Sequence, residues 1–150
     1  MAERLLSECL AIVGTVDPDA YATGTQLTDA IDMSVHRQVM FIVEAGTLGS
    51  SATIDFYVME CATSGGTYTR LSGKNITQLT QAGTDSDKQA IVNVRAEELT
   101  AGYRYLKGSL RVGTATSDAG VMALASKTRF SDAVTTTSYG DLASVDEIVA

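Results

Sequence analysis

The chain has 150 residues, of which 45% are hydrophobic and 19% charged, a composition typical of one globular domain rather than of a disordered chain. Its formal net charge of −7 disfavours binding to nucleic acid or to an anionic membrane surface, because either polyanion would repel it. Cys9 and Cys61 are its only cysteines and lie far apart in the sequence, so we expect two buried free thiols and no disulfide framework.

Residues 1–24 are predicted to form an N-terminal arm and a turn. Apolar residues between Glu3 and Val13 recur near helical spacing, but the β-branched Ile12 and Val13 and then Gly14 follow, so a short helix and an extended arm both remain open. Asp17–Ala20 contains the only proline and is predicted to be the turn. No stretch approaches the roughly 20 apolar residues that a membrane-spanning helix needs.

Residues 25–126 are predicted to form a β-sandwich core, because they contain short alternating runs separated by turn residues. Val35–Glu44 is apolar on both faces and is expected to be a central strand, paired with Thr53–Cys61 as a hairpin with a long connection. Tyr103 and Tyr105 follow a predicted corner and suggest a tyrosine corner. The expected strands are 26–33, 35–44, 53–61, 68–71, 76–79, 89–95, 103–112 and 121–125.

Seven or eight short strands at near-regular spacing predict an all-β protein. The expected architecture is an antiparallel β-sandwich or jelly roll with extended N- and C-terminal arms.

Few residues have the character of a catalytic or metal site. His36 is the only histidine, so we interpret it as a structural residue that is neither a triad base nor a zinc ligand. Two pairs of aspartates, Asp17 with Asp19 and Asp85 with Asp87, lack the remaining positions of a calcium loop. We therefore predict a protein that is not an enzyme and that uses no cofactor or metal.

Two further groups of charged residues are weak candidates. The adjacent Glu97 and Glu98 are expected to point apart, which disfavours a paired-carboxylate site. Arg104, Lys107 and Arg111 could line one basic stripe, as in a reader of polyanions. The surrounding acidic residues favour a solvated face or a salt-bridged protein interface for this stripe instead.

Residues 127–150 differ from the core and are predicted to form an extended C-terminal arm. From Phe130 to Ala150 apolar side chains are scattered among Asp, Ser, Thr and Gly, with no basic residue. We expect this arm to contact another protein, and the alternative is a tail that folds back on its own domain. The candidate interface residues are the apolar anchors Phe130, Val134, Tyr139, Leu142, Val145, Ile148 and Val149, with Asp132, Asp141, Asp146 and Glu147 supplying charge complementarity.

Seven segments carry a resemblance to a known family through their order and spacing. They are Ile31–Ser34, Gln38–Val43, Gly46–Gly49, Lys74–Leu79, Lys88–Leu99, Gly102–Lys107 and Asp141–Val149. Together they resemble the small capsid decoration, or cement, proteins encoded beside the major capsid genes of tailed bacteriophages, from about Asp29 to Ala150. Each motif alone has low specificity, because it is a hydrophobic pattern or a turn.

The resemblance implies a structural virion protein with no catalytic residues. Such a protein is made in the host cytoplasm and binds the capsid exterior, where it stabilises contacts between subunits of the major capsid protein and self-associates as a dimer or trimer. The alternative is a β-sandwich module of a phage tail or surface that recognises a receptor or carbohydrate, with Tyr21, Tyr68 or Tyr139 stacking on a sugar. The absence of Trp weakens this alternative.

Overall fold

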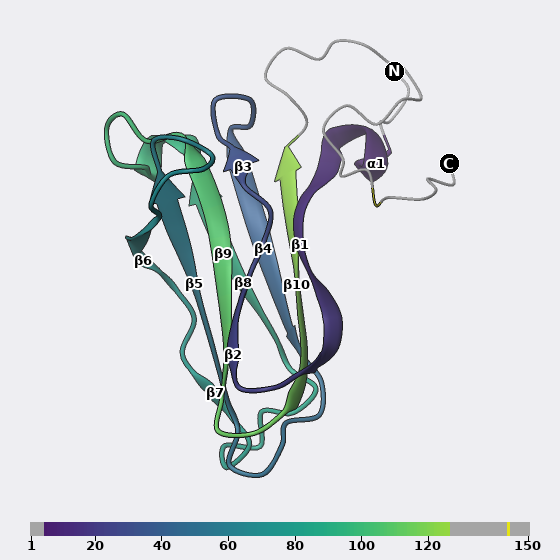
Figure 1. The fold of residues 1–150 in the computed structure, drawn as a ribbon. Helices are drawn as coiled ribbons and strands as arrows, with labels where there is room; N and C mark the ends of the chain where they lie inside the picture. Colours follow the sequence, from purple (N-terminus) through teal and green to yellow (C-terminus); the bar gives the residue numbers. More distant parts are fainter. Residues whose placement is uncertain (1–4, 127–143, 145–150) are drawn as a thin grey trace.

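In a computed structural model of the chain, which describes residues 5–126 and Ser144, two antiparallel β-sheets pack face to face as a sandwich (Figure 1). The predicted all-β class and antiparallel sandwich are confirmed. The elements are α1 (Leu6–Cys9), β1 (Leu10–Tyr21), β2 (Gly24–Leu27), β3 (Ile31–Asp32), β4 (Gln38–Ala45), β5 (Thr53–Cys61), β6 (Thr69–Asn75), β7 (Leu79–Thr80), β8 (Gln89–Arg95), the single 3-10 turn η1 (Ala96–Glu98), β9 (Tyr105–Gly113) and β10 (Ser117–Ser126).

The strands divide between two sheets, which we call sheet A and sheet B. Sheet A has the order β1-β10-β4-β8, and sheet B has the order β2-β9-β5-β6, with β3 paired to β9 and β7 paired to β5. The predicted hairpin of β4 and β5 is wrong, because these consecutive strands belong to different sheets. Their connecting loop crosses the end of the core and buries Leu48 and Ala52 there, so it joins the two layers.

Period-two alternation builds the core between the sheets. Val39, Phe41 and Val43 of β4 and Ile54, Phe56 and Val58 of β5 are all at most 1% exposed. The rings of Phe41 and Phe56 meet across the sandwich with centroids 5.5 Å apart and planes tilted by 49°. The predicted central position of the Val35–Glu44 run is confirmed, since β4 lies between β10 and β8.

The segment predicted to be an N-terminal arm is largely a strand of the sandwich. After the single turn α1, β1 pairs with β10 along its length and buries Ala11, Val13 and Val16. The predicted turn at Asp17–Ala20 lies inside β1, where the register shifts between Val16 and Asp19. A β-bulge on an edge strand accommodates the proline, which has no N–H to donate. Cys9 is exposed, contrary to prediction, whereas Cys61 is buried and both are free.

The strand expected at Gln26–Met33 is divided into β2 and β3, which both pair with β9. Thr28 lies between them and is buried. Its N–H donates to the Gly108 carbonyl oxygen at 2.9 Å, and its hydroxyl accepts from the Gly108 N–H at 2.8 Å. The side chain of Thr28 thus takes over a backbone position in the ladder, which interrupts the regular strand.

Candidate binding surfaces

All the predicted interface residues of the C-terminal arm, from Phe130 to Val149, lie outside the described residues, as does the predicted arm 127–150 apart from Ser144. Ser144 is an exposed turn residue. These residues therefore keep the status of predictions. The surfaces described below belong to the sandwich itself.

His36 has the environment of a structural histidine. It is 5% exposed, and its Nδ1 lies 2.7 Å from the carbonyl oxygen of Ser126. Because a carbonyl oxygen only accepts, Nδ1 carries the proton in this hydrogen bond. His36 therefore ties the segment before β4 to the last residue of β10.

The aspartate pairs do not converge on a common point. Asp85 accepts from Lys88 Nζ at 2.8 Å and from the Thr80 N–H at 2.9 Å, and these bonds lower the pKa of its carboxyl group. Asp17 accepts a 3.4 Å hydrogen bond from the hydroxyl of Thr15. Within residues 5–126 and Ser144, no three His, Cys, Asp or Glu side chains are grouped so that they could hold a metal ion.

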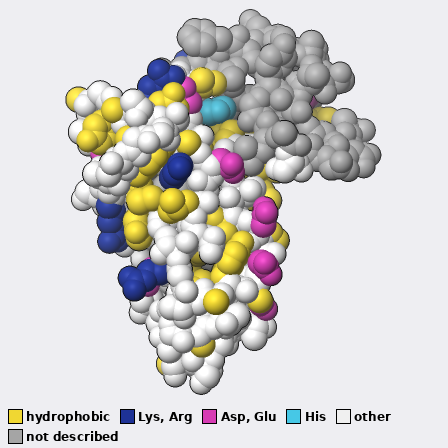
Figure 2. Space-filling model, viewed as in Figure 1, with side chains coloured by type: hydrophobic (Ala, Val, Ile, Leu, Met, Phe, Trp, Pro, Cys, Tyr) yellow, Lys and Arg dark blue, Asp and Glu magenta, His cyan; other side chains and the backbone are white. Residues whose placement is uncertain are grey.

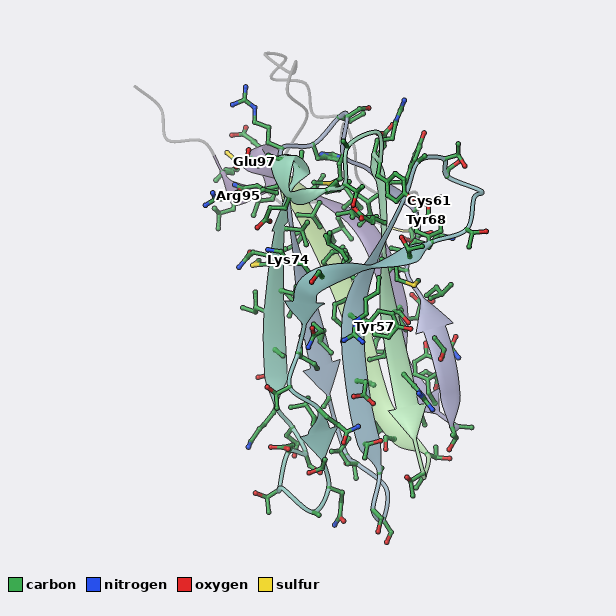
Figure 3. The ribbon with its side chains drawn as sticks, turned by 90° about the vertical axis from the view of Figure 1, so that its left-hand side faces the viewer. Tyr57, Cys61, Tyr68, Lys74, Arg95 and Glu97 are labelled. Carbon is green, nitrogen blue, oxygen red and sulfur yellow. The ribbon has the colours of Figure 1, made fainter. Side chains whose placement is uncertain are left out.

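Glu97 and Glu98 have separate roles at the edge where β6 approaches β8 (Figure 3). Glu98 accepts from the backbone N–H of Arg95 at 2.8 Å and from Lys74 at 2.9 Å, and these two bonds lower the pKa of its carboxyl group. Lys74 also donates to the Asn93 carbonyl oxygen at 2.8 Å. Lys74 thus joins β6 of sheet B to β8 of sheet A. Glu97 is 76% exposed, and its Oε1 makes a long contact of 3.7 Å with Nη1 of Arg95.

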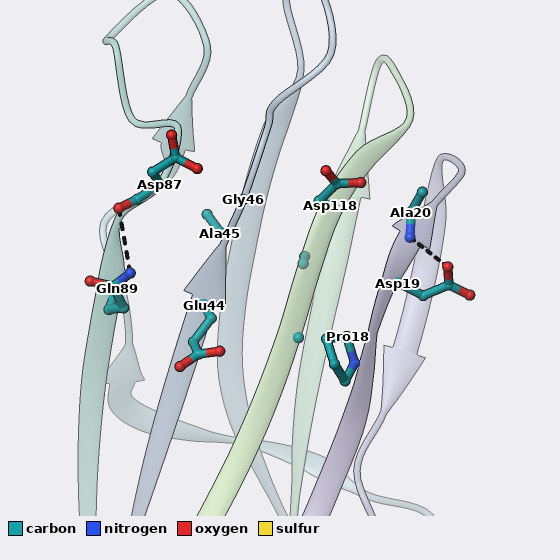
Figure 4. Close-up of a pocket in the computed structure, with 11 residues that line it drawn as sticks. Pro18, Asp19, Ala20, Glu44, Ala45, Gly46, Asp87, Gln89 and Asp118 are labelled. Carbon is teal, nitrogen blue, oxygen red and sulfur yellow. Dashed lines mark hydrogen bonds between the residues drawn. The ribbon is translucent and has the colours of Figure 1, made fainter.

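An open hollow of about 600 Å³ lies at one end of the outer face of sheet A (Figure 4). All four strands of this sheet contribute to its lining, and we call it the acidic hollow because of its four carboxylates, Asp19, Glu44, Asp87 and Asp118. Figure 4 shows these side chains spread around the hollow instead of directed at one point. It is an electronegative surface with no built ligand geometry.

Of the predicted basic stripe, Lys107 and Arg111 lie on β9 and Arg104 directly precedes it, and the charges of Arg104 and Lys107 are engaged within the protein. Arg104 forms a two-point ion pair with Asp32, with a 3.1 Å bond from Nε to Oδ1, and its guanidinium lies 4.9 Å from the Tyr105 ring centroid. Lys107 Nζ lies 4.9 Å from the Tyr68 ring centroid. Arg111 is exposed and lies opposite Asp55 in the register. Figure 2 shows Lys and Arg side chains mostly on the left of the visible face, where Figure 1 places β5 and β6.

The tyrosines proposed to stack on a sugar are held by local contacts. The hydroxyl of Tyr21 donates to the Asp17 carbonyl oxygen at 2.5 Å, and that of Tyr68 donates to the Ser64 carbonyl oxygen at 3.0 Å. One face of Tyr68 is covered by Lys107, and burial raises the pKa of its hydroxyl. A tyrosine corner was predicted at Tyr103 or Tyr105, but among the described residues neither of their hydroxyls bonds to nearby backbone. Tyr21 and Tyr68 make such a hydrogen bond instead. Tyr139 lies outside the described residues.

Two neighbouring rows of apolar side chains on the outer side of sheet A form a surface that was not expected. In the first row, Leu124 of β10 lies opposite Met40 of β4. In the next outward-facing row, Ile42 of β4 lies between Met122 of β10 and Ile91 of β8. Ile91 is 58% exposed and Met122 is 40% exposed, and the others are half-buried. We call these five residues, Met40, Ile42, Ile91, Met122 and Leu124, the apolar face.

Two signals for the apolar face were already present in the sequence. Met40 and Ile42 are the second apolar set of the strand that was expected to be buried on both sides, and Ile91 interrupts an otherwise polar outward set on β8. The alternation alone does not show whether a second apolar set is covered by the same chain. In the structure the described part of the sandwich leaves Ile91 and Met122 exposed and the other three half-buried.

The chain matches no protein-family model and no curated protein significantly. Across residues 5–126 and Ser144, no helix has the length and apolar character to span a membrane.

Proposed function

We propose that this protein is a structural component of a bacteriophage head, a capsid decoration protein that binds the outer surface of the shell and stabilises contacts between major capsid subunits. The observation that supports a role in assembly is the apolar face, where Ile91 and Met122 remain exposed beside three half-buried apolar side chains. A contiguous apolar patch on a sheet face is typical of a protein–protein contact. The resemblance to decoration proteins supplies the identity of the assembly.

The strand order supports the jelly-roll form of this proposal. Sheets with the orders β1-β10-β4-β8 and β2-β9-β5-β6 arise when the chain passes repeatedly from one layer to the other. A jelly roll has eight strands in two sheets, built from two Greek keys. The eight strands of these two paths, without the short β3 and β7, have such an order. β1 and β10, the first and last strands of the sandwich, pair with each other. This pairing ties both ends of the domain into one sheet, which suits a rigid module on a lattice.

In the proposal, the C-terminal arm 127–150 makes the contact with the shell. Its apolar residues, such as Phe130, Leu142 and Ile148, would insert between capsid subunits, and its acidic residues would meet basic groups there. Binding of many copies side by side offsets the entropy lost when each arm is ordered.

Capsids that lack the protein provide the test. Purified full-length protein should bind them and raise the temperature at which they release their genome or fall apart. A chain that ends at Ser126 should fold, as judged by circular dichroism, and should lose this binding, whereas unchanged binding would contradict the arm model. Absence of any capsid binding by the full-length chain would contradict the proposed function.

The receptor-binding or carbohydrate-binding alternative has weaker support. Tyr57 of β5 and Tyr68, just before β6, have aromatic faces near the surface, but Arg70 lies 4.7 Å from the Tyr57 ring centroid and Lys107 covers one face of Tyr68. Each contact occupies one of the ring faces on which a sugar could stack. Glycan binding by a monomer that ignores capsids would favour this alternative.

A further inference from the structure

The outer face of sheet A carries opposite charges at its two ends. The acidic hollow lies at one end, around Gln89 of β8. At the other end of the same strand, Arg95 is 68% exposed and forms a solvent-exposed ion pair of 3.7 Å with Glu97, and the exposed Arg37 adds a second positive charge just before β4. Gln89 and Arg95 point outward six residues apart, which corresponds to about 20 Å. The apolar face lies between these charged ends.

We propose that the apolar face of sheet A docks a second copy of this chain in an antiparallel arrangement. The twofold axis lies in the interface, perpendicular to the strands and between the two apolar rows. Rotation about this axis exchanges the rows, so Met40 faces Ile42 of the second copy and Leu124 faces its Met122. The four apolar residues of β4 and β10 are therefore self-complementary, and on β8 Ile91 of each copy lies against Asn93 of the other, beside Met40 of that copy.

The charges select this orientation. The same rotation brings Arg95 of each copy toward the acidic hollow of the other, where Glu44 lies on the strand next to Gln89. A twofold axis parallel to the strands would instead place one hollow against the other and leave both Arg95 side chains at the opposite end, so that neither Arg95 meets a hollow and the carboxylates of the two hollows repel one another. The antiparallel dimer is thus favoured by electrostatics as well as by apolar contact.

A second copy fits this face better than a shell subunit does. A different partner would need a basic group to fill the hollow and, about 20 Å away, an acidic group to meet Arg95. A second copy has both groups in the required positions. The inference extends the proposed function by naming the surface through which copies pair, and it leaves the C-terminal arm available for the shell.

Sedimentation velocity of the purified full-length chain tests the face. We expect a dimer at about 10 µM, and Ile91→Asp or Met122→Asp should weaken dimerisation at least about tenfold. Leu27→Asp is the matched control, because Leu27 is 49% exposed on β2 at the edge of sheet B. It should leave dimerisation unchanged. A wild-type chain that stays monomeric to about 1 mM, or a dimer that Leu27→Asp disrupts and Ile91→Asp does not, would overturn the proposal.

A charge exchange tests the orientation. Glu44→Arg and Arg95→Glu should each weaken the dimer, because each leaves two like charges facing one another across the interface. The double variant should regain at least half of the loss on a logarithmic scale, because the arginine introduced in one copy would then meet the glutamate introduced in the other. Circular dichroism confirms that each variant is folded. A double variant that dimerises no better than either single variant would overturn the antiparallel arrangement.

Capsid binding separates this inference from the proposed function. If the wild-type chain forms a dimer that Ile91→Asp disrupts, but the wild-type chain does not bind capsids, the pairing surface is supported and the decoration role is contradicted. A monomer that binds capsids through its apolar face, so that Ile91→Asp abolishes capsid binding, overturns the pairing and retains the decoration role.

Discussion

Among the described residues, Glu60 is a buried carboxylate whose two oxygens both have a hydrogen-bond donor. Glu60 is 4% exposed, and its two oxygens accept from the N–H of Thr100 at 2.8 Å and from the hydroxyl of Thr100 at 2.5 Å. These bonds fix the corner between η1 and β9 to the end of β5. Period two already places Glu60 on the buried face of β5 with Ile54, Phe56 and Val58, but the sequence pattern does not show which group satisfies its carboxylate.

Replacement of Glu60 by Ala should destabilise the fold. The Thr100 N–H and hydroxyl would lose their acceptor in a partly buried site, which costs about 1–3 kcal/mol. The free energy of unfolding in urea measures this loss. Glu97→Ala, which removes a 76% exposed carboxylate, should change it by less than about 0.5 kcal/mol, and equal effects of the two variants would contradict the assignment.

Asp32 should make the stability depend on acid pH. Partial burial acts to raise the pKa of its carboxyl group, but hydrogen bonds from Arg104 and Ser34 outweigh burial and hold the pKa below the usual 3.8. A carboxyl group with a lowered pKa in the folded state contributes stability above its usual value and loses it as pH falls through the folded value. The melting temperature of Asp32→Asn should therefore lie below that of wild type at pH 7.

The difference in melting temperature between wild type and Asp32→Asn should shrink as pH falls below about 4. Asp118→Asn, at an exposed position on β10, controls for the loss of one negative charge. A gap that is constant from pH 7 to pH 2 would show that the ion pair with Arg104 does not titrate as proposed.

At the scale of elements, alternation in the sequence predicts the strands better than it predicts their partners. The bounds expected for β5 and β8 agree with the structure, because Ile54, Phe56 and Val58, and likewise Val92 and Val94, are buried on one side. The pairing of β4 with β10 and β8 could not be predicted, since a side-chain pattern specifies which face is buried and leaves the neighbouring strand undetermined.

The same limit explains the misplaced N-terminal boundary. The consecutive residues Asp17, Pro18 and Asp19 resemble a turn in the sequence. Only their pairing with β10 shows that they lie inside the twelve-residue edge strand β1, at a bulge. The candidate arm residues from Phe130 to Val149 lie outside the described residues and stay predictions. The apolar face was visible as a second apolar set on β4, but its exposure depends on the whole sandwich.

Packing between neighbouring strands requires glycine at position 108. A Cβ atom at Gly108 would lie 2.7 Å from Phe56 Cε2 and 3.1 Å from Thr28 Cγ2. Gly108→Ala should therefore displace the Phe56 ring and destabilise the fold by about 1–3 kcal/mol, measured by urea unfolding. Gly65→Ala is the control, since a Cβ atom there would meet nothing within 4 Å, and a similar loss at Gly65 would contradict steric crowding at β9.

At the scale of the whole molecule, two apolar interfaces have different roles. The inner interface holds the sheets together through side chains that are almost fully buried, among them Phe41 of sheet A and Phe56 of sheet B. The outer apolar face of sheet A is not covered by the packing of the two sheets and stays partly exposed. Substitutions in the first should change stability, and substitutions at Ile91 or Met122 should change association with little effect on stability.

The contact of Phe41 with Phe56 should appear as an energetic coupling between the sheets. Phe41→Leu and Phe56→Leu each remove a ring from the centre of the core, and the second substitution costs less once the first has removed its partner ring. Urea unfolding of the wild type, the two single variants and the double variant should give a coupling of about 0.5–1.5 kcal/mol. Strictly additive losses would show that each ring contributes through burial alone. Dimerisation of the folded variants should match that of the wild type, because neither ring reaches the outer face of sheet A.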